Sequence, residues 1–211
     1  MKSAYSWTDK NVQRRIISHS GFRLDGLGDL LPRAAGASVF DVGCNRGHVC
    51  FDLMHHGASI LHGCDNSADT IRHANELFAD YRHAQHKFEV VDLTGGAAAV
   101  DKAFPNRQVP GGITPEKYDM VLMLAVYHKL RRVMELKDLL TLVGYFAHRC
   151  GKFFVWRGSR EELGEFEPTV IAEGFRRVHY SEICEIELPE YTETVAQPAA
   201  IWARVDPRGT L

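Results

Sequence analysis

The chain has 211 residues, of which 45% are hydrophobic and 25% charged, with a formal net charge of -2 and a pI near 6.6. A chain of this size and apolar content suits one domain with a single sizeable core. Its nearly balanced charge excludes a general attraction to phosphate backbones, so nucleic-acid binding would need a local basic patch. The pairs Arg14-Arg15 and Arg131-Arg132 are more typical of solvated helix faces.

Cysteine and histidine usage indicate neither a disulfide framework nor a metal site. The five cysteines are odd in number and never form Cys-x-x-Cys. The pairs His55-His56 and His83/His86 lack a third ligand in a recognisable pattern, so we expect no metal. The first residues carry no apolar run of signal-peptide length, and no stretch reaches transmembrane length. We therefore expect a cytoplasmic protein with no membrane partner.

The first 36 residues precede the first strong strand signal. Asp9 to Ser18 has a narrow apolar edge at helical spacing and predicts a helix. Leu24 to Ala34 predicts a second short helix. Residues 1–36 are therefore expected to form an N-terminal helical cap on the domain that follows.

The segment Ser38 to Gly47 combines a short buried-type strand with a glycine turn. The strand residues end in Asp41, and the motif Asp-x-Gly-x-x-x-Gly leads into a helix predicted over residues 48–56. The carboxyl ends of strands are where open α/β sheets bind ligands, and Gly43 has no Cβ to keep a ligand away. The dinucleotide-binding and phosphate-binding glycine spacings are both absent, since Asn45 stands where one glycine would be.

Two further strand signals also end in aspartate. Ala58 to Cys64 ends in Asp65, about twenty residues past the glycines, where an acid of a βαβ unit can chelate a ribose diol. Ser67 is a good N-cap for a helix through Phe78. Lys87 to Val91 ends in Asp92. Three successive strands each end in Asp, so three acids should line one edge of one sheet.

The middle of the chain is irregular and then strongly helical. Thr94 to Lys117 contains a short helix signal over 97–104 followed by several Pro and Gly residues. We predict that either this long segment or the N-terminal helix closes over the site. A fourth strand begins at Tyr118. Arg131 to His148 has apolar residues at helical spacing and predicts one amphipathic helix, and Lys152 to Trp156 predicts a fifth strand.

The end of the chain changes character. After a helix predicted over Ser159 to Glu173, Phe175 to Ile186 and Ala199 to Val205 predict two strands joined only by a loop. Strands without an intervening helix pair antiparallel, whereas the earlier strand and helix alternation favours a parallel sheet covered on both faces.

These segments resemble the class I S-adenosylmethionine-dependent methyltransferases. The resemblance rests on Asp41 to Gly47, on Asp65, on Asp92-Leu93 and on the segment Tyr118 to His128. It covers roughly residues 37–156 and departs at Asn45, where the family more often has Gly. It implies a single-domain α/β fold with a Rossmann-like sheet, mostly parallel, with a C-terminal antiparallel hairpin and helices on both faces. Residues 37–211 would form the methyltransferase domain, and residues 1–36 would lie on its substrate side.

The resemblance also implies S-adenosyl-L-methionine as cofactor and S-adenosyl-L-homocysteine as product. Asp41 would face the ammonium of the methionine portion, Asp65 the ribose hydroxyls and Asp92 the adenine amino group. For each acid, a helix cap or a turn is the structural alternative. The expected cofactor-binding residues are Asp41, Gly43, Cys44, Asn45, Gly47, Asp65, Asn66, Asp92, Leu93 and Leu124.

In this family, substrates meet the cofactor at the end of the fourth strand, which here is followed by Tyr127-His128-Lys129. His128 is the candidate catalytic residue, because an imidazole that titrates near neutrality can deprotonate an acceptor hydroxyl; a loop histidine without this role is the alternative. Tyr127 is expected in the core. The Asn/Asp-Pro-Pro-aromatic and Pro-Cys sequences of two nucleic-acid methylating classes are missing.

The sequence therefore predicts an S-adenosylmethionine-dependent methyltransferase acting on an oxygen or nitrogen of a small molecule or sugar, with a small-molecule or glycan acceptor as partner. An RNA-end or tRNA methyltransferase is the alternative, because the Gly-Cys-Asn turn also looks like that of RNA 5′-phosphate-capping methyltransferases. A nicotinamide-dependent oxidoreductase is disfavoured by the glycine spacing. A cofactor-binding protein without catalysis is the fourth interpretation.

Overall fold

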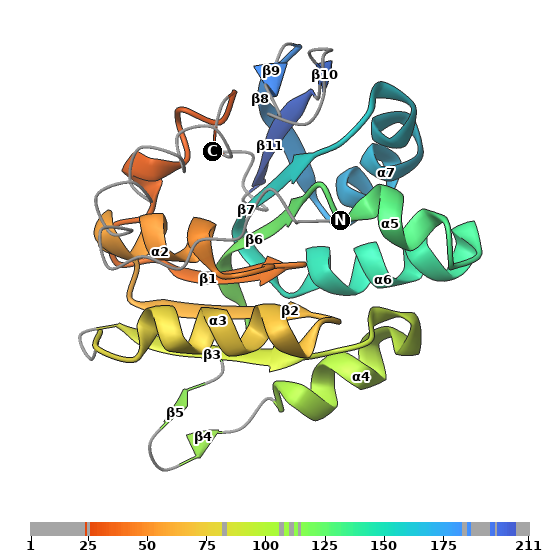
Figure 1. The fold of residues 1–211 in the computed structure, drawn as a ribbon. Helices are drawn as coiled ribbons and strands as arrows, with labels where there is room; N and C mark the ends of the chain where they lie inside the picture. The colour runs from red at the N-terminus through yellow and green to blue at the C-terminus, as the bar shows by residue number, and fades with distance from the viewer. Residues whose placement is uncertain are drawn as a thin grey trace.

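The computed structural model describes residues 24, 26–81, 84–105, 108–109, 112–113, 115–182, 185–186, 195–196 and 198–205. A seven-stranded sheet with the order β3-β2-β1-β6-β7-β11-β8 runs through this part of the chain (Figure 1). Its strands are β1 (Ser38–Val42), β2 (Ile60–Asp65), β3 (Gln85–Val90), β6 (Tyr118–Leu124), β7 (Cys150–Arg157), β8 (Phe175–Ser181) and β11 (Ala199–Arg204).

The pairing of these strands confirms the predicted fold class. The five strands from β3 to β7 in the sheet order are parallel to one another, and β11 is antiparallel to both β7 and β8. The strand order reverses at β1, because β2 lies on one side of it and β6 on the other. Open α/β sheets bind ligands at such a switch point.

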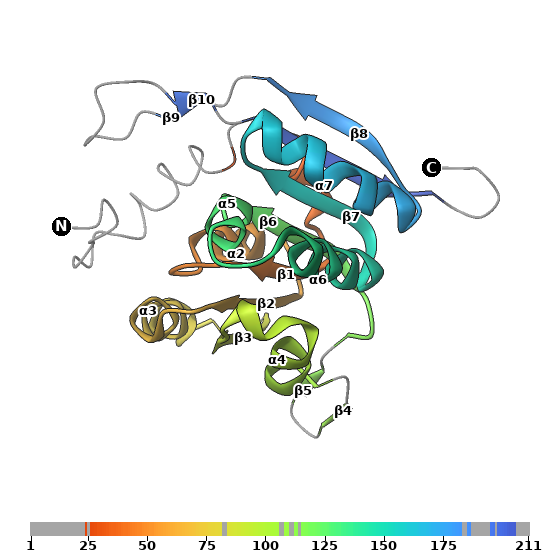
Figure 2. The ribbon, with the colours of Figure 1, turned by 90° about the vertical axis from the view of Figure 1, so that its right-hand side faces the viewer.

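Helices cover both faces of the sheet. The α-helices are α2 (His48–His55), α3 (Ala68–Phe78), α4 (Gly96–Ala103), α5 (Tyr127–Arg131), α6 (Leu136–His148) and α7 (Arg160–Ala172). Residues of α2 and α3 belong to one buried cluster, and residues of α4 to α7 belong to the other. Figure 2 shows α3 and α4 on opposite sides of β2 and β3. None of the described helices is both long and apolar enough to cross a membrane.

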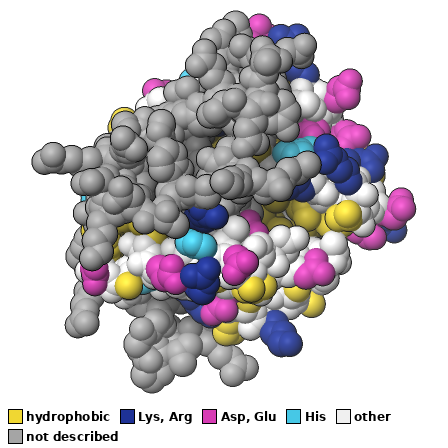
Figure 3. Space-filling view, viewed as in Figure 1, with side chains coloured by type: hydrophobic (Ala, Val, Ile, Leu, Met, Phe, Trp, Pro, Cys, Tyr) yellow, Lys and Arg dark blue, Asp and Glu magenta, His cyan; other side chains and the backbone are white. Residues whose placement is uncertain are grey.

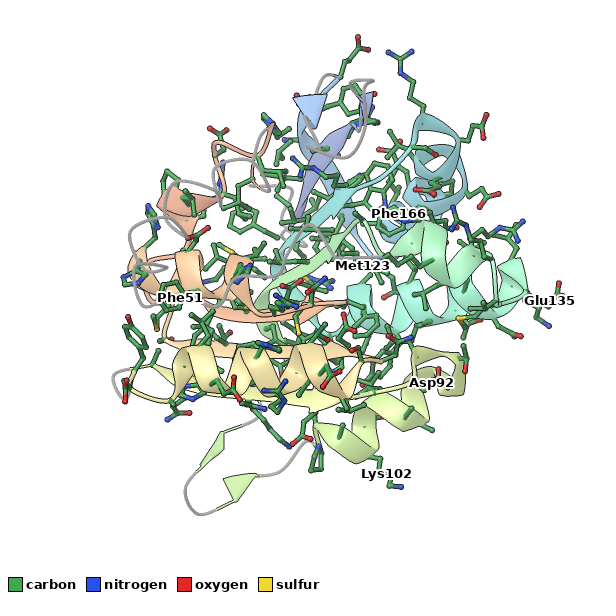
Figure 4. All side chains as sticks on the ribbon, viewed as in Figure 1. Phe51, Asp92, Lys102, Met123, Glu135 and Phe166 are labelled. Atoms are coloured by element: carbon green, nitrogen blue, oxygen red, sulfur yellow. The ribbon has the colours of Figure 1, made fainter. Side chains whose placement is uncertain are left out.

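Large side chains fill the two layers. Figure 4 labels Phe51 of α2 in one layer and Met123 of β6 and Phe166 of α7 in the other, and all three are fully buried. Burying one such side chain contributes about 1.5–3 kcal/mol. The same apolar periodicity that predicts the elements therefore also provides the core that fixes the strand ends in space.

The predicted cap Ser67 is confirmed, and the structure shows a second cap that was not predicted. Ser67 precedes α3 and its hydroxyl accepts a hydrogen bond from the backbone N–H of Thr70. Ser159 precedes α7 and forms a capping box with Glu162. Both caps hold polar helix ends at the edge of the sheet where the strands finish.

Two helix predictions are wrong in their extent. Among residues 26–34 only the 3-10 helix η1 (Leu31–Arg33) is helical. Gly26 has a positive φ, which lies outside the helical region, and Pro32 stands in the first turn of η1. The helix predicted over residues 131–148 begins five residues later, at Leu136, because α5 ends at Arg131 and Glu135 is extended before α6. Val133, between them, is 67% exposed. The helix predicted over residues 9–18 lies outside the described residues.

The segment 94–117 does not lie where a lid was predicted. After the 3-10 helix η2 (Leu93–Gly95) and α4, it passes through the short paired strands β4 (Gln108–Val109) and β5 (Gly112–Ile113) to the amino end of β6. There Arg149 donates to the carbonyl of Pro115. In Figure 1, β4 and β5 lie below β3 at the bottom of the view, far from α5. A second short pair, β9 (Glu185–Ile186) with β10 (Val195–Ala196), extends the C-terminal hairpin.

Candidate active site

The carboxyl ends of five parallel strands surround one pocket of about 620 Å³. This volume is within the range of small-molecule sites. Ten of the eleven sequence-predicted site residues line it, namely Asp41, Gly43, Cys44, Asn45, Asp65, Asn66, Asp92, Leu93, Leu124 and His128. From the segment predicted as a lid, Thr94 is the one described residue among the lining residues, so the lid prediction is wrong for the described part of 94–117.

The first turn of the site is shaped by left-handed backbone. Gly43 has φ 77°, and its N–H donates to the carbonyl of Cys64 at 2.8 Å. A Cβ on Gly43 would lie 2.7 Å from Cγ2 of Val126. Glycine is therefore required here by the packing of Val126 as well as by φ. Asn45 has φ 51°, a conformation that Asn tolerates better than most residues, which explains how Asn fits where the family more often has Gly.

Gly47 has a structural role that was not predicted. It is the N-cap of α2 with φ 75°, and it is not among the pocket-lining residues. A Cβ at this position would lie 3.1 Å from the Cβ of Ala74 in α3. The missing side chain thus allows α2 and α3 to pack closely, and the contact of Gly47 with the ligand stays a prediction.

Asp65 is held rigidly and still presents both carboxylate oxygens. Its Oδ2 accepts from the backbone N–H of Asn45 at 3.1 Å, and Oδ1 accepts from that of Ser67 at 3.1 Å. The hydroxyl of Thr70 has one proton to donate. It lies 3.3 Å from Oδ1 but 2.9 Å from the carbonyl of Ser67, so it donates to that carbonyl. Since a carboxylate oxygen has two acceptor sites, one remains on each oxygen of Asp65. This arrangement suits a vicinal diol.

Asp92 both caps a helix and lines the pocket. It is the N-cap of η2, and its Oδ1 accepts from the backbone N–H and hydroxyl of Thr94. These hydrogen bonds lower the pKa of Asp92, so its carboxylate is ionised at neutral pH. Figure 4 shows Asp92 at the end of β3. Within the described residues its Oδ2 accepts no hydrogen bond, which leaves that oxygen for a ligand.

Asp41 is a buried acid among protonated thiols. It is 3% exposed, and the thiol of Cys50 donates to its Oδ2 at 3.7 Å. Burial, followed by the charge of Asp41, raises the pKa of Cys44 and of Cys50 well above the ordinary value. Cys44 therefore contributes a neutral thiol to the pocket and no thiolate nucleophile. In the part of the chain described, no three His, Cys, Asp or Glu residues gather as metal ligands.

The acceptor end of the pocket is built by the turn after β6. Ala125 has φ 55°, an uncommon left-handed conformation for a residue with a Cβ, and its N–H donates to the carbonyl of Arg157 at 3.0 Å. Tyr127 is fully buried, as predicted, and its hydroxyl lies 3.1 Å from a carboxylate oxygen of Glu165 in α7. Arg131 pairs with the same carboxylate. The turn and these contacts fix α5 beside the pocket.

His128 lies on α5 and lines the pocket. Burial lowers its pKa from the ordinary value; Glu162 acts in the opposite direction, and Lys129 and Arg132 lower the pKa further. The imidazole is therefore neutral at neutral pH and can accept a proton. This geometry is compatible with the predicted role of His128 as a base.

Sequence reasoning missed several lining residues of the acceptor end. Arg157 at the end of β7, Lys129 on α5 and the apolar side chains Val126, Leu130 and Val133 all line the pocket. Figure 3 shows Lys, Arg and His side chains gathered over α5, beside the atoms drawn in grey, and mixed charges elsewhere on that face. Lys129 was visible in the sequence as a charged residue, but its presence in the same pocket as Arg157 follows only from the neighbouring positions of β6 and β7.

Comparison with known proteins identifies the fold. No protein-family model and no curated protein matches the sequence. The structure resembles magnesium protoporphyrin IX methyltransferase from Synechocystis, solved with bound S-adenosylmethionine, with a TM-score of 0.64 and 16% identity over 96% of this chain and 88% of that chain. It also resembles a ribosomal protein methylase from Lactobacillus delbrueckii (TM-score 0.54, 15% identity, 89% and 79% covered). A third match is an S-adenosylmethionine-dependent methyltransferase from Mesorhizobium loti (TM-score 0.57, 17% identity, 87% and 98% covered).

The protein therefore has the fold of the class I S-adenosylmethionine-dependent methyltransferases. The strand order with its antiparallel last hairpin and the coverage of nearly the whole chain agree on this point. The similar structures carry the names of enzymes with unlike acceptors, a porphyrin and a ribosomal protein. The fold alone consequently leaves the acceptor open.

Proposed function

We propose that this protein is an S-adenosylmethionine-dependent methyltransferase that acts on an oxygen or nitrogen of a small molecule or sugar. The observation that supports it most is the convergence of Asp41, Asp65 and Asp92 from three strands on one pocket, which also receives His128 from the opposite side. A binding site without catalysis would not need a neutral imidazole at its far end.

The residues present fit the cofactor. Asp65 offers one acceptor site on each oxygen for the ribose hydroxyls, and Asp92 offers Oδ2 for the adenine amino group. Asp41 provides a negative charge for the ammonium of the methionine portion. When bound, S-adenosylmethionine supplies a methyl group on a positively charged sulfur. Gly43 and Asn45 keep the backbone of the turn close to that portion of the pocket.

The protein has three tasks in this reaction: placement, water exclusion and proton removal. Val126 and Leu130 provide apolar walls, and each is 8% exposed. His128 accepts the proton of an acceptor hydroxyl or amine as the new bond to the methyl group forms. In this proposal residues 1–36 cap the acceptor side, and the enzyme works in the cytoplasm.

Calorimetry tests the cofactor assignment directly. The protein should bind S-adenosylmethionine and S-adenosylhomocysteine and should not bind a nicotinamide dinucleotide. Release of S-adenosylhomocysteine in a screen of hydroxyl and amine acceptors then tests catalysis. Binding of the nicotinamide dinucleotide alone would refute the proposal, and cofactor binding without methylated product would favour a non-catalytic protein.

A further inference from the structure

The first turn of α7 lies next to the helix that carries His128. β7 ends at Arg157, which lines the pocket, and α7 begins three residues later. In Figure 1, α7 lies just above α5 in the view. Tyr127 of α5 joins the two helices, because its hydroxyl lies 3.1 Å from a carboxylate oxygen of Glu165 and its ring packs edge-on against Phe166 at 5.8 Å. The amino-terminal half of α7 is therefore fixed against α5.

Glu162 has a defined position in this first turn. It is three residues before Glu165, so the two acids lie on the same face of α7. Its Oε2 accepts from the backbone N–H of Ser159 at 3.0 Å, which folds the partly buried side chain back toward the start of the helix. A Cβ on Gly158 would overlap both this oxygen and the ring of Trp156. Glycine at this position therefore leaves room for the carboxylate beside the end of β7.

The charge of Glu162 acts on the imidazole of His128. Burial lowers the pKa of His128. Of the charged groups that act on this ring, Glu162 acts most strongly and raises the pKa, whereas Lys129 and Arg132 lower it. Other titratable or charged groups on α5 and the elements around it are Tyr127, Arg131, Glu135, Arg157 and Glu165. Glu162 thus favours the protonated form of a ring that burial keeps neutral.

The proposed reaction creates a positive charge on this ring. His128 takes a proton from the acceptor on a ring nitrogen, while a lone pair of the acceptor takes the methyl group from the sulfonium. The electrons of the broken carbon–sulfur bond stay on the sulfur, which becomes neutral. The positive charge has then moved to the imidazolium of His128. A fixed negative group beside α5 stabilises this charge as it develops.

We propose that Glu162 is a positioning residue of the active site, whose carboxylate stabilises the imidazolium that His128 forms during methyl transfer. The proposal rests on the proposed methyltransferase function and adds a residue to the same site. Glu162 is not among the described residues that line the pocket, so it acts through His128 and does not touch the acceptor. The carboxylate that caps α7 thereby has a second task.

Glu162→Gln tests the charge separately from the cap, because a capping box accepts Gln as well as Glu at this position. We expect an NMR titration of the His128 ring, in protein saturated with S-adenosylhomocysteine, to give a lower pKa than in the unmodified protein. The loss of one signal in His128→Ala assigns the ring. On an acceptor found by screening, turnover at neutral pH should fall about five- to thirtyfold with KM little changed. The acidic limb of the pH–rate profile should move to lower pH, which a merely structural defect would not cause.

Glu161→Gln is the matched control. Glu161 is exposed, and its substitution makes the same charge change in the same turn of α7. The control should titrate as the unmodified protein does. An unchanged titration of His128 in Glu162→Gln, or equal shifts in the two variants, would overturn the proposal. The titration needs no acceptor, so its result is separate from the methyltransferase function itself, which a lack of S-adenosylhomocysteine affinity in the unmodified protein would refute.

Discussion

Replacing Asp65 by Asn is the most direct test of the proposed cofactor-binding residues. The carboxylate binds two backbone N–H groups, those of Asn45 and Ser67, and retains one acceptor site on each oxygen. Asn keeps one acceptor oxygen but turns an NH₂ group toward the other donor. The substitution therefore removes one of the two hydrogen bonds to the ribose and makes the other a hydrogen bond to a neutral group. It also weakens the contact that holds the turn at Asn45.

The magnitude follows from these contacts. A hydrogen bond to a charged group is worth about 1.5–3 kcal/mol, so the dissociation constant of S-adenosylhomocysteine should rise by roughly ten- to a hundredfold. The free energy of unfolding should fall by about 1–2 kcal/mol for the lost backbone contact. Calorimetry at neutral pH measures the first quantity, and urea denaturation the second.

Asp69→Asn provides the control for the Asp65 experiment. Asp69 is four residues further along on α3, its side chain is 87% exposed, and among the described residues it pairs with Arg72 at 3.6 Å. This variant should bind S-adenosylhomocysteine as the unmodified protein does, since exposed ion pairs contribute little. If Asp65→Asn is folded and binds equally well, the ribose lies elsewhere and the argument from the free acceptor sites is wrong.

Three further predictions concern catalysis and stability. His128→Ala should keep cofactor affinity, lower turnover by about 10²–10⁴ and abolish the acidic limb of the pH–rate profile. In the unmodified protein this limb should lie below the usual pKa of an imidazole, because burial lowers the pKa of His128. Wild-type turnover of the variant on the true acceptor would exclude a role as base. Burial lowers the pKa of His62 to about 4, so the unfolded chain binds more protons between about pH 4 and 6.5. The free energy of unfolding should thus fall by up to roughly 3 kcal/mol as pH decreases through that range, and His62→Gln should lack this slope in denaturant titrations. Gly47→Ala should lower the free energy of unfolding by about 1–2 kcal/mol because its φ is 75°; a large loss of cofactor affinity in the folded protein would instead place Gly47 against the ligand.

The proposed cofactor-binding residues could be predicted from the sequence because the patterns that indicate them are local. A run of strand-forming residues that ends in Asp41, Asp65 or Asp92 already places the acid at a strand end. The parallel sheet then brings these ends together without further information. The sequence did not reveal that Gly43 and Gly47 are required by neighbouring side chains, Val126 and Ala74, because those contacts join distant segments.

The acceptor end of the pocket was less predictable because it depends on packing between elements. The break between α5 and α6 has no Gly or Pro to mark it, and the apolar spacing continues across Val133 as if one helix were present. Only the structure shows that the break turns Val133 into the pocket and that β7 carries Arg157 to the same place.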